Sequence, residues 1–208
     1  VILPKKKRHE GQMGRFLRAT LVVLCLSSCG GGGGNYSAPR QLDDACAILR
    51  ERSQYLRAME ATERRWGIPV HVQMATIYQE SKFVGNARTP FRYALGIIPM
   101  GRQSSAYGYS QAIDGTWDEY RRGPGRGGAR RDRIEDATDF MGWYMAETQN
   151  RLGISTFDAR NQYLAYHEGR SGYSSGSHNG KAWLLRVADE VATRAETYQM
   201  QLIACGRA

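Results

Sequence analysis

A glutamate at the end of an apolar helical segment is the first candidate for catalysis in this chain. Glu80 follows a stretch in which Val70, Met74 and Ile77 recur at the spacing of one helix face. A carboxyl group at the C-terminal end of a helix lies at the negative end of the helix dipole, and apolar neighbours such as Phe83 disfavour its ionised form. Both effects raise the pKa of a carboxyl group, so Glu80 is suited to act as a general acid near neutral pH.

Two later segments carry polar and aromatic side chains of the kinds that bind sugars. Residues 105–111 read Ser-Ala-Tyr-Gly-Tyr-Ser-Gln, and residues 163–169 read Tyr-Leu-Ala-Tyr-His-Glu-Gly. A glycine lets the backbone approach a ligand closely, and a glutamine amide offers both a donor and an acceptor. The side chains and backbone positions that we expect to contact a sugar here are Tyr107, Gly108, Tyr109, Gln111 and His167.

The Glu80-Ser81 pair and these two segments, in this order, resemble the three signature segments of the lytic transglycosylases of the soluble-lytic (SLT) type. That family belongs to the lysozyme-like superfamily and cleaves bacterial peptidoglycan. The resemblance covers approximately residues 65–175. It implies that Glu80 protonates the bond between MurNAc and GlcNAc, that Ser81 lies beside the substrate's N-acetyl group, and that the hydroxyl of Tyr166 orients Glu80.

The reaction implied by the resemblance uses one carboxyl group. Most glycosidases use two, one as the acid and one as nucleophile or base. In the lytic transglycosylases the same glutamate first donates a proton and then accepts one from the C6 hydroxyl, which attacks C1 and forms a 1,6-anhydroMurNAc end. No cofactor is implied. Residues 81–111 contain no Asp or Glu, which favours this reaction over lysozyme-like hydrolysis.

The chain departs from the family pattern in all but the first segment. Tyr109 replaces an apolar residue, and either sugar stacking or packing in the cleft wall explains it. His167 and Glu168 replace the usual Asn-Ala pair: His167 can donate from a ring nitrogen, and Glu168 is either a second functional carboxylate or a charged turn residue. Residues 90–104 look like an insertion that forms a cleft wall, a lid or a separate lobe.

The elements that must position these residues are predominantly helical. The pattern predicts helices over residues 39–66 and 69–80, with Gly67 ending the first and Pro69 opening the second. Strand signals are confined to residues 91–98, which we expect to form a short hairpin or an irregular lobe. The residues expected to cap later helices are Asp114, Asp132, Ser155 with Asp158, and Asn179.

Length and composition indicate one folded domain. Residues 40–208 suffice for one hydrophobic core and show no internal repeat. The helical pattern and the resemblance together predict a mainly α, lysozyme-like domain with a substrate cleft. We expect it to be a monomer.

The N-terminal region has the layout of a secretory signal. In residues 1–28, basic residues precede an apolar stretch that is too short for a permanent transmembrane helix. The sequence Leu-Ser-Ser-Cys at residues 26–29 resembles a bacterial lipobox, which implies cleavage before Cys29 and lipid attachment to its thiol. A plain signal peptide with a chance cysteine is the alternative.

Residues 29–39 then form a lipidated, glycine-rich tether. No Asp follows Cys29, a pattern compatible with an outer-membrane lipoprotein whose domain faces the periplasm. Met13 fits a natural start, so we interpret residues 1–12 as an artefact of gene prediction or cloning.

Charge and cysteine content fit an exported protein that meets a glycan. Six basic residues and one acidic residue lie in residues 1–28, so a formal net charge of +9 falls to +4 for the remainder. That value suits a glycan polymer with peptide carboxylates better than nucleic acid. Cys46 and Cys205 lie near the two ends of the domain, and an oxidising periplasm favours a disulfide between them over two buried thiols.

Three other features of the sequence concern a metal site, nucleic-acid binding and a non-catalytic function. His167 and His178 match no metal-binding spacing, so we expect no metal. The Arg- and Gly-rich residues 121–131 resemble a nucleic-acid-binding tract, but a solvated interhelix loop or a contact to anionic glycan or lipid explains them better in an exported protein. The rival of another class is a non-catalytic, peptidoglycan-binding lipoprotein, which the altered third segment favours and Glu80 opposes.

Overall fold

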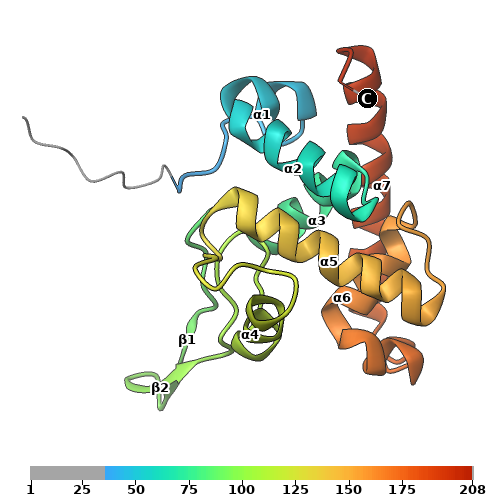
Figure 1. Cartoon of the computed structure of the whole chain (residues 1–208). Helices are drawn as coiled ribbons and strands as arrows, with labels where there is room; N and C mark the ends of the chain where they lie inside the picture. Colours follow the sequence, from blue (N-terminus) through green and yellow to red (C-terminus); the bar gives the residue numbers. More distant parts are fainter. Residues whose placement is uncertain (1–35, 208) are drawn as a thin grey trace, which may run out of the picture. The chain divides into compact units, whose positions relative to one another are not determined.

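The computed structural model describes residues 36–207, which form a predominantly helical domain with one two-stranded sheet (Figure 1). The mainly α class predicted from the sequence is confirmed. The signal region, the lipidation candidate Cys29 and the glycine run lie outside the described residues. In chain order the elements are α1 (Ala45–Glu51), α2 (Ser53–Trp66), α3 (Val70–Ser81), β1 (Phe91–Ala94), β2 (Ile98–Arg102), α4 (Asp114–Arg122), α5 (Ile134–Leu152), α6 (Ala159–Ser174) and α7 (Ala182–Ala204).

Helix α3 is the central element of the core. It contacts α2, α5, α6 and α7. Val70, Met74 and Ile77 are buried as the periodicity predicted, but Val72 and Ala75 on other faces are fully buried as well. The prediction of a single apolar face was therefore too narrow, because a helix enclosed by four others needs small or apolar residues on most sides. This enclosure holds the C-terminal turn of α3, which carries Glu80, in a fixed position.

The predicted helix over residues 39–66 is two helices. The chain breaks at Arg52, whose φ of −128° and ψ of 68° are not helical. Helix α1 begins after Asp44, whose side chain accepts a hydrogen bond from the Ala47 N–H. Helix α2 ends at Gly67 as predicted, with this glycine in the left-handed conformation.

Three of the predicted caps are wrong. Helices α4, α5 and α7 begin after Ile113, Arg133 and Lys181, and none of these residues makes a side-chain cap hydrogen bond. Asp114 instead lies 2.7 Å from Arg131, and Asp132 lies 2.9 Å from Arg130. These carboxylates pair with arginines rather than with helix N–H groups. In the predicted Ser155–Asp158 pair, Asp158 is the cap of α6.

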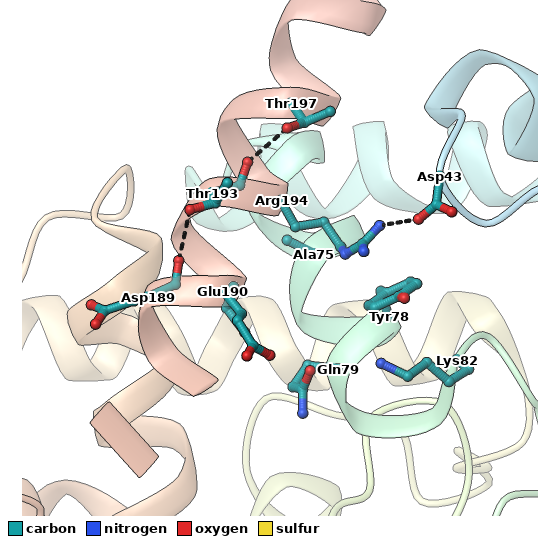
Figure 2. Close-up of a pocket in the computed structure, with 11 residues that line it drawn as sticks. Asp43, Ala75, Tyr78, Gln79, Lys82, Asp189, Glu190, Thr193, Arg194 and Thr197 are labelled. Atoms are coloured by element: carbon teal, nitrogen blue, oxygen red, sulfur yellow. Dashed lines mark hydrogen bonds and ion pairs between the residues drawn. The ribbon is translucent and has the colours of Figure 1, made fainter. Parts of the chain in front are cut away.

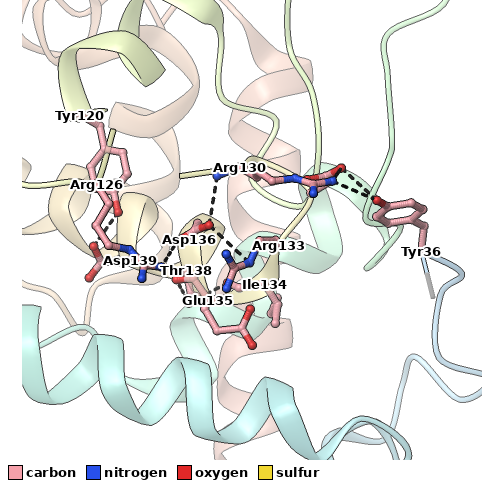
Figure 3. Close-up of polar contacts among 11 residues, drawn as sticks. Tyr36, Tyr120, Arg126, Arg130, Arg133, Ile134, Glu135, Asp136, Thr138 and Asp139 are labelled. Carbon is pink, nitrogen blue, oxygen red and sulfur yellow. Dashed lines mark hydrogen bonds and ion pairs between the residues drawn. The ribbon is translucent and has the colours of Figure 1, made fainter. Parts of the chain in front are cut away.

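The Arg- and Gly-rich residues 121–131 form a loop that is tied to carboxylates. Arg126 lies 2.7 Å from the buried Asp136, which also accepts a hydrogen bond from the Arg130 N–H at 3.0 Å (Figure 3). The Arg130 guanidinium reaches Asp132, and Tyr36 donates to the same carboxylate at 3.1 Å. These contacts supply the hydrogen-bond partners that the buried Asp136 carboxylate needs. The loop is therefore an anchor for the start of α5 rather than a free basic tract.

A disulfide joins Cys46 in α1 to Cys205 directly after α7, across a sequence separation of 159 residues. It ties the two ends of the described domain together. None of the helices within residues 36–207 combines the length and the apolar character needed to cross a membrane.

The predicted hairpin is present and extends beyond the expected residue 98. Strands β1 and β2 pair in antiparallel fashion, with Tyr93 opposite Pro99 and a register irregularity between Phe91 and Tyr93. The hairpin projects away from the helices (Figure 1). Its base is closed by Thr89, whose hydroxyl donates to the Ser104 carbonyl oxygen at 2.9 Å.

Candidate active site

Glu80 lies one residue before the end of α3, where the chain reverses sharply. Lys82 and Phe83 both adopt left-handed backbone conformations, with φ of 50° and 61°. Two successive non-glycine residues in this region are costly and persist only where the surroundings enforce them. The fully buried Phe83 ring stacks on Tyr55 with 5.9 Å between centroids. Packing of Phe83 thus fixes the turn that follows Glu80.

Glu80 lines a cavity of about 520 Å³ that also receives residues from the base of the hairpin, from α4, from α5 and from α6. Its side chain is half-buried. One wall of the cavity is aromatic and consists of Phe140 and Tyr144 of α5 and Tyr166 of α6. A concave site with an aromatic wall and a few polar groups is typical of ligand binding.

The surroundings of Glu80 favour its protonated form. Loss of solvation raises its pKa from 4.5 to about 7, although a hydrogen bond from Tyr163 and the charge of Lys82 act in the opposite direction. The carboxyl group is therefore distributed between both protonation states near neutral pH. This is the condition for a group that first gives a proton and later takes one back.

The tyrosine whose hydroxyl lowers the pKa of Glu80 is Tyr163 rather than the predicted Tyr166. The Tyr166 hydroxyl donates to the carbonyl oxygen of Ser110 at 2.7 Å. Tyr166 still lines the cavity, and its ring lies edge-on to Tyr144 with 5.3 Å between centroids. The two tyrosines are three residues apart and so share a face of α6. That spacing was the signal in the sequence that could have identified Tyr163.

Glu168 also lines the cavity, but its oxygens are already bound. Lys181 lies 2.7 Å and 2.8 Å from the two oxygens, Ser177 donates to one, and His167 Nδ1 lies 3.1 Å from the other. The Lys181 and Ser177 contacts lower the pKa of Glu168 to about 2. The two cavity carboxyl groups are thus strongly separated in pKa, and Glu168 is ionised at neutral pH.

Gly169 gives the third segment its shape. Its φ of 76° and ψ of 156° interrupt α6, in a backbone region that is essentially restricted to glycine. The interruption lies immediately after His167 and Glu168. It therefore sets where these two side chains lie at the cavity edge.

Gln111 and His167 are predicted sugar contacts that do line the cavity. The Gln111 amide nitrogen donates to the carbonyl oxygens of Ala87 at 3.0 Å and Gly108 at 2.8 Å. Its Oε1 therefore remains as an acceptor for a ligand. The His167 ring is exposed and lies edge-on to Trp183, with 5.3 Å between centroids.

Ser81 and Tyr107 are not among the residues that line this cavity. Ser81 is buried, and its hydroxyl donates back to the Ile77 carbonyl oxygen at 3.2 Å. Tyr107 donates to Asp132 at 3.3 Å and carries the Arg88 guanidinium 4.2 Å above its ring. Neither side chain has the position expected for a sugar contact.

Gly108 and Tyr109 serve packing. A Cβ atom on Gly108 would lie 2.1 Å from the Arg131 carbonyl oxygen, so the glycine is required by protein backbone rather than by a sugar. Tyr109 is 4% exposed, and its hydroxyl lies 3.1 Å from that of Tyr55. Of the two explanations for Tyr109, packing is the one that the structure supports.

Several lining residues were not among the predicted contacts. Thr89, Ser104 and Thr116 bring hydroxyl groups to the cavity, and α5 brings two rings, those of Phe140 and Tyr144. Their shared i, i+4 spacing predicts a buried face. It does not reveal that this face ends at a cavity.

A second cavity of about 530 Å³ uses the neighbouring part of α3. Figure 2 shows Tyr78 between Arg194, whose guanidinium lies 3.4 Å from the ring centroid, and Lys82, whose ammonium lies 3.6 Å away. Arg194 also pairs with Asp43 at 2.9 Å. None of the predicted sugar contacts lines this cavity. Within residues 36–207 no group of three His, Cys, Asp or Glu side chains is arranged to hold a metal ion.

Comparison with known families accounts for nearly the whole sequence. The transglycosylase SLT domain family matches residues 17–205, a range that includes Glu80 and both later segments. No curated protein matches the chain with significant similarity. The match agrees with the mainly helical fold, and it supports a peptidoglycan lytic transglycosylase in general terms. The chain therefore belongs to the transglycosylase SLT domain family.

Proposed function

We propose that this protein cleaves the β-1,4 bond between MurNAc and GlcNAc in peptidoglycan and leaves 1,6-anhydroMurNAc ends, with Glu80 as general acid and base. The observation that carries the proposal is the half-buried Glu80 carboxyl in an aromatic-walled cavity, with its pKa raised to about 7. A carboxyl group of this kind is suited to protonate a leaving oxygen near neutral pH. The family match supports the substrate class.

The proposed reaction has two proton transfers through one carboxyl group. Protonated Glu80 donates to the glycosidic oxygen as the bond to C1 breaks. Ionised Glu80 then takes the proton of the C6 hydroxyl, whose oxygen attacks C1, so that the enzyme is regenerated and no water is consumed. The Tyr163 hydroxyl stabilises the ionised form between these steps.

The substrate contacts that we propose are Gln111, through Oε1, and His167, through its ring. The Gln111 nitrogen is held by two carbonyl oxygens, which fixes the acceptor without loss of side-chain freedom on binding. Tyr144 and Tyr166 offer aromatic surface. Tyr166 also holds the Ser110 segment against α6 and so acts as a positioning residue.

Hydrolysis by a lysozyme-like route is the second candidate, because an ionised Glu168 lines the same cavity. Its oxygens already receive Lys181, Ser177 and His167, which favours a structural role. The third candidate, a binding protein without turnover, has no use for a carboxyl group with a raised pKa. Transglycosylation is therefore the function that the geometry supports best.

The deciding experiment is mass spectrometry of fragments released from purified sacculi. We expect products with 1,6-anhydroMurNAc ends, each one water lighter than the hydrolysis product. Glu80→Gln should release nothing and still bind sacculi, whereas the matched control Glu196→Gln, at an exposed position on α7, should act as wild type. Reducing ends would establish hydrolysis, and Glu168→Gln would then test the second carboxylate. Equal binding without any product from wild type or control would favour the non-catalytic alternative.

We also propose that the protein is an exported, monomeric lipoprotein, anchored through Cys29 to the outer membrane and facing the periplasm. The Cys46–Cys205 disulfide supports an oxidising compartment. Cys29 and the tether lie outside the described residues. Incorporation of a labelled fatty acid that is lost in Cys29→Ala, followed by membrane fractionation and native mass measurement, tests the anchor, the membrane and the monomer.

A further inference from the structure

We propose that the β1–β2 hairpin is a lipid-binding element that inserts its tip into the headgroup region of an anionic bilayer. The hairpin carries a concentration of exposed apolar side chains. Leu95 and Ile97, at the tip, are 90% and 79% exposed. The other large apolar side chains exposed on the hairpin are Phe91, Tyr93, Ile98 and Met100. Exposed apolar surface of this kind marks a site of interaction with a membrane or another macromolecule.

Both faces of the hairpin carry apolar side chains, which favours lipid over a protein partner. Side chains alternate between the faces along each strand. Tyr93 and its partner Pro99 lie on one face, while Ala94 and its partner Ile98 lie on the other. A protein partner covers one face of a ribbon, whereas a bilayer surrounds an inserted tip on all sides. An isolated two-stranded hairpin is also only marginally stable in water, and insertion would relieve that weakness.

The charge of the segment matches an anionic surface. Residues 81–113 contain no Asp or Glu. Within the hairpin, Arg92 and Arg102 are exposed. Arg102 lies 4.3 Å above the Phe91 ring and donates to the Thr89 carbonyl oxygen at 2.6 Å, which fixes its guanidinium at the base of the hairpin. Basic side chains near a membrane surface are attracted by anionic lipid headgroups.

The order of side chains along the hairpin follows the layers of a bilayer. Aliphatic Leu95 and Ile97 occupy the tip, aromatic Tyr93 comes next, and Arg102 lies at the base opposite Phe91. Aromatic rings favour the interface and arginines the headgroups. Four residues of strand span about 13 Å, so insertion of the tip by about 5–10 Å leaves Arg102 at headgroup level.

The position of the hairpin links membrane contact to the candidate active site. Thr89 and Ser104, which close the hairpin base, also line the cavity of Glu80. A bilayer that holds the tip therefore sets the distance and orientation of the cavity relative to the membrane surface. This role is independent of an N-terminal lipid and of the proposed reaction.

The test is amide hydrogen exchange of the full chain with and without vesicles, because the readout is local and a membrane-active leader does not affect its interpretation. Vesicles of phosphatidylglycerol and phosphatidylcholine should slow exchange in residues 91–102, and pure phosphatidylcholine should do so much less. Combined Leu95→Asp and Ile97→Asp should abolish this protection, because each change replaces an apolar side chain at the tip with a charged one whose transfer into the bilayer is unfavourable.

The matched control replaces two exposed apolar side chains elsewhere, Met200→Asp and Ile203→Asp on α7, and should leave the protection intact. Both double variants should retain the wild-type circular dichroism spectrum and product release from sacculi. Unprotected residues 91–102 in the presence of bound anionic vesicles would overturn the proposal. Protection that depends on protein concentration or on sacculi instead of lipid would assign the surface to a second copy or to glycan and would equally overturn it.

Discussion

Replacement of Tyr163 by phenylalanine separates its hydrogen bond from its packing. Tyr163 is buried, and its hydroxyl stabilises the ionised form of Glu80. Removal of the hydroxyl should therefore raise the pKa of Glu80 further above its present value of about 7. In the proposed reaction the first proton transfer needs protonated Glu80, so the variant should keep its activity to a higher pH than wild type.

The size of the shift follows from the energy of one hydrogen bond to a charged group, about 1.5–3 kcal/mol. Glu80 is half-buried, so water recovers part of this energy. A remainder of about 1.4 kcal/mol corresponds to one pKa unit. The alkaline limb of kcat/KM should thus move by about one pH unit toward higher pH, while kcat falls because the ionised intermediate state is less stable.

The assay is the initial rate of anhydro-product formation from soluble glycan strands as a function of pH. Tyr173→Phe is the matched control on the same helix, since its hydroxyl donates to Asn161 at 3.0 Å. Its pH profile should equal that of wild type. An alkaline limb that stays in place in Tyr163→Phe, or moves to lower pH, would refute the assignment of Tyr163 as the partner of Glu80.

Three further predictions concern stability. The folded-state pKa of Glu80 is raised from 4.5 to about 7, so ionisation of this group destabilises the fold as the pH rises through this window. Glu80→Gln should therefore increase the free energy of unfolding by up to about 3 kcal/mol above pH 7 and change it little below pH 4.5. Urea denaturation at several pH values measures this difference. Combined Cys46→Ser and Cys205→Ser should lower the free energy of unfolding by up to about 5 kcal/mol, because the disulfide closes a loop of 159 residues. Gly169→Ala should lower the melting temperature by an amount equivalent to about 1–3 kcal/mol and reduce turnover, because its φ of 76° and ψ of 156° suit glycine alone.

Each of these predictions has a clear contrary result. A stabilisation of Glu80→Gln that is independent of pH would show that ionisation is not its cause. A serine double variant that unfolds at the same urea concentration as oxidised wild type would contradict the loop-closure argument. Gly180→Ala is the glycine control, since no atom lies within 4 Å of its added Cβ; an equal loss of stability there would remove the special role of Gly169.

The residues of the site were predicted with unequal success, and the reasons are physical. Glu80, near the end of α3, and Gln111, in the turn before α4, both line the cavity, and both belong to short motifs that can be recognised locally in the sequence. The tyrosine partner of Glu80 was assigned to Tyr166 by resemblance, but the Tyr166 hydroxyl donates to the Ser110 carbonyl oxygen, and Tyr163 on the same helix face is the tyrosine that lowers the pKa of Glu80. Helical spacing predicts which residues share a face of α6, but the packing of α6 against α3 decides which of them comes close to the Glu80 carboxyl group.

The caps show how tertiary contacts override local preference. Asp114 and Asp132 have the residue type of a helix cap, yet Arg131 and Arg130 bind their side chains. Similarly, Tyr109 and Gly108 have the types of sugar contacts, but Tyr55 and the Arg131 backbone explain them. A short sequence segment does not contain the partners that arrive from elsewhere in the chain.

The sequence by itself determined the helical class, the family and the position of the acidic residue, because periodicity, breakers and short motifs are local properties of the chain. The tertiary structure decided the pKa of Glu80, the engagement of Glu168 and the exposure of the hairpin. These properties depend on burial and on neighbours that are distant in sequence. Burial raises the pKa of the Glu80 carboxyl group, whereas hydrogen bonds from Lys181 and Ser177 keep Glu168 ionised.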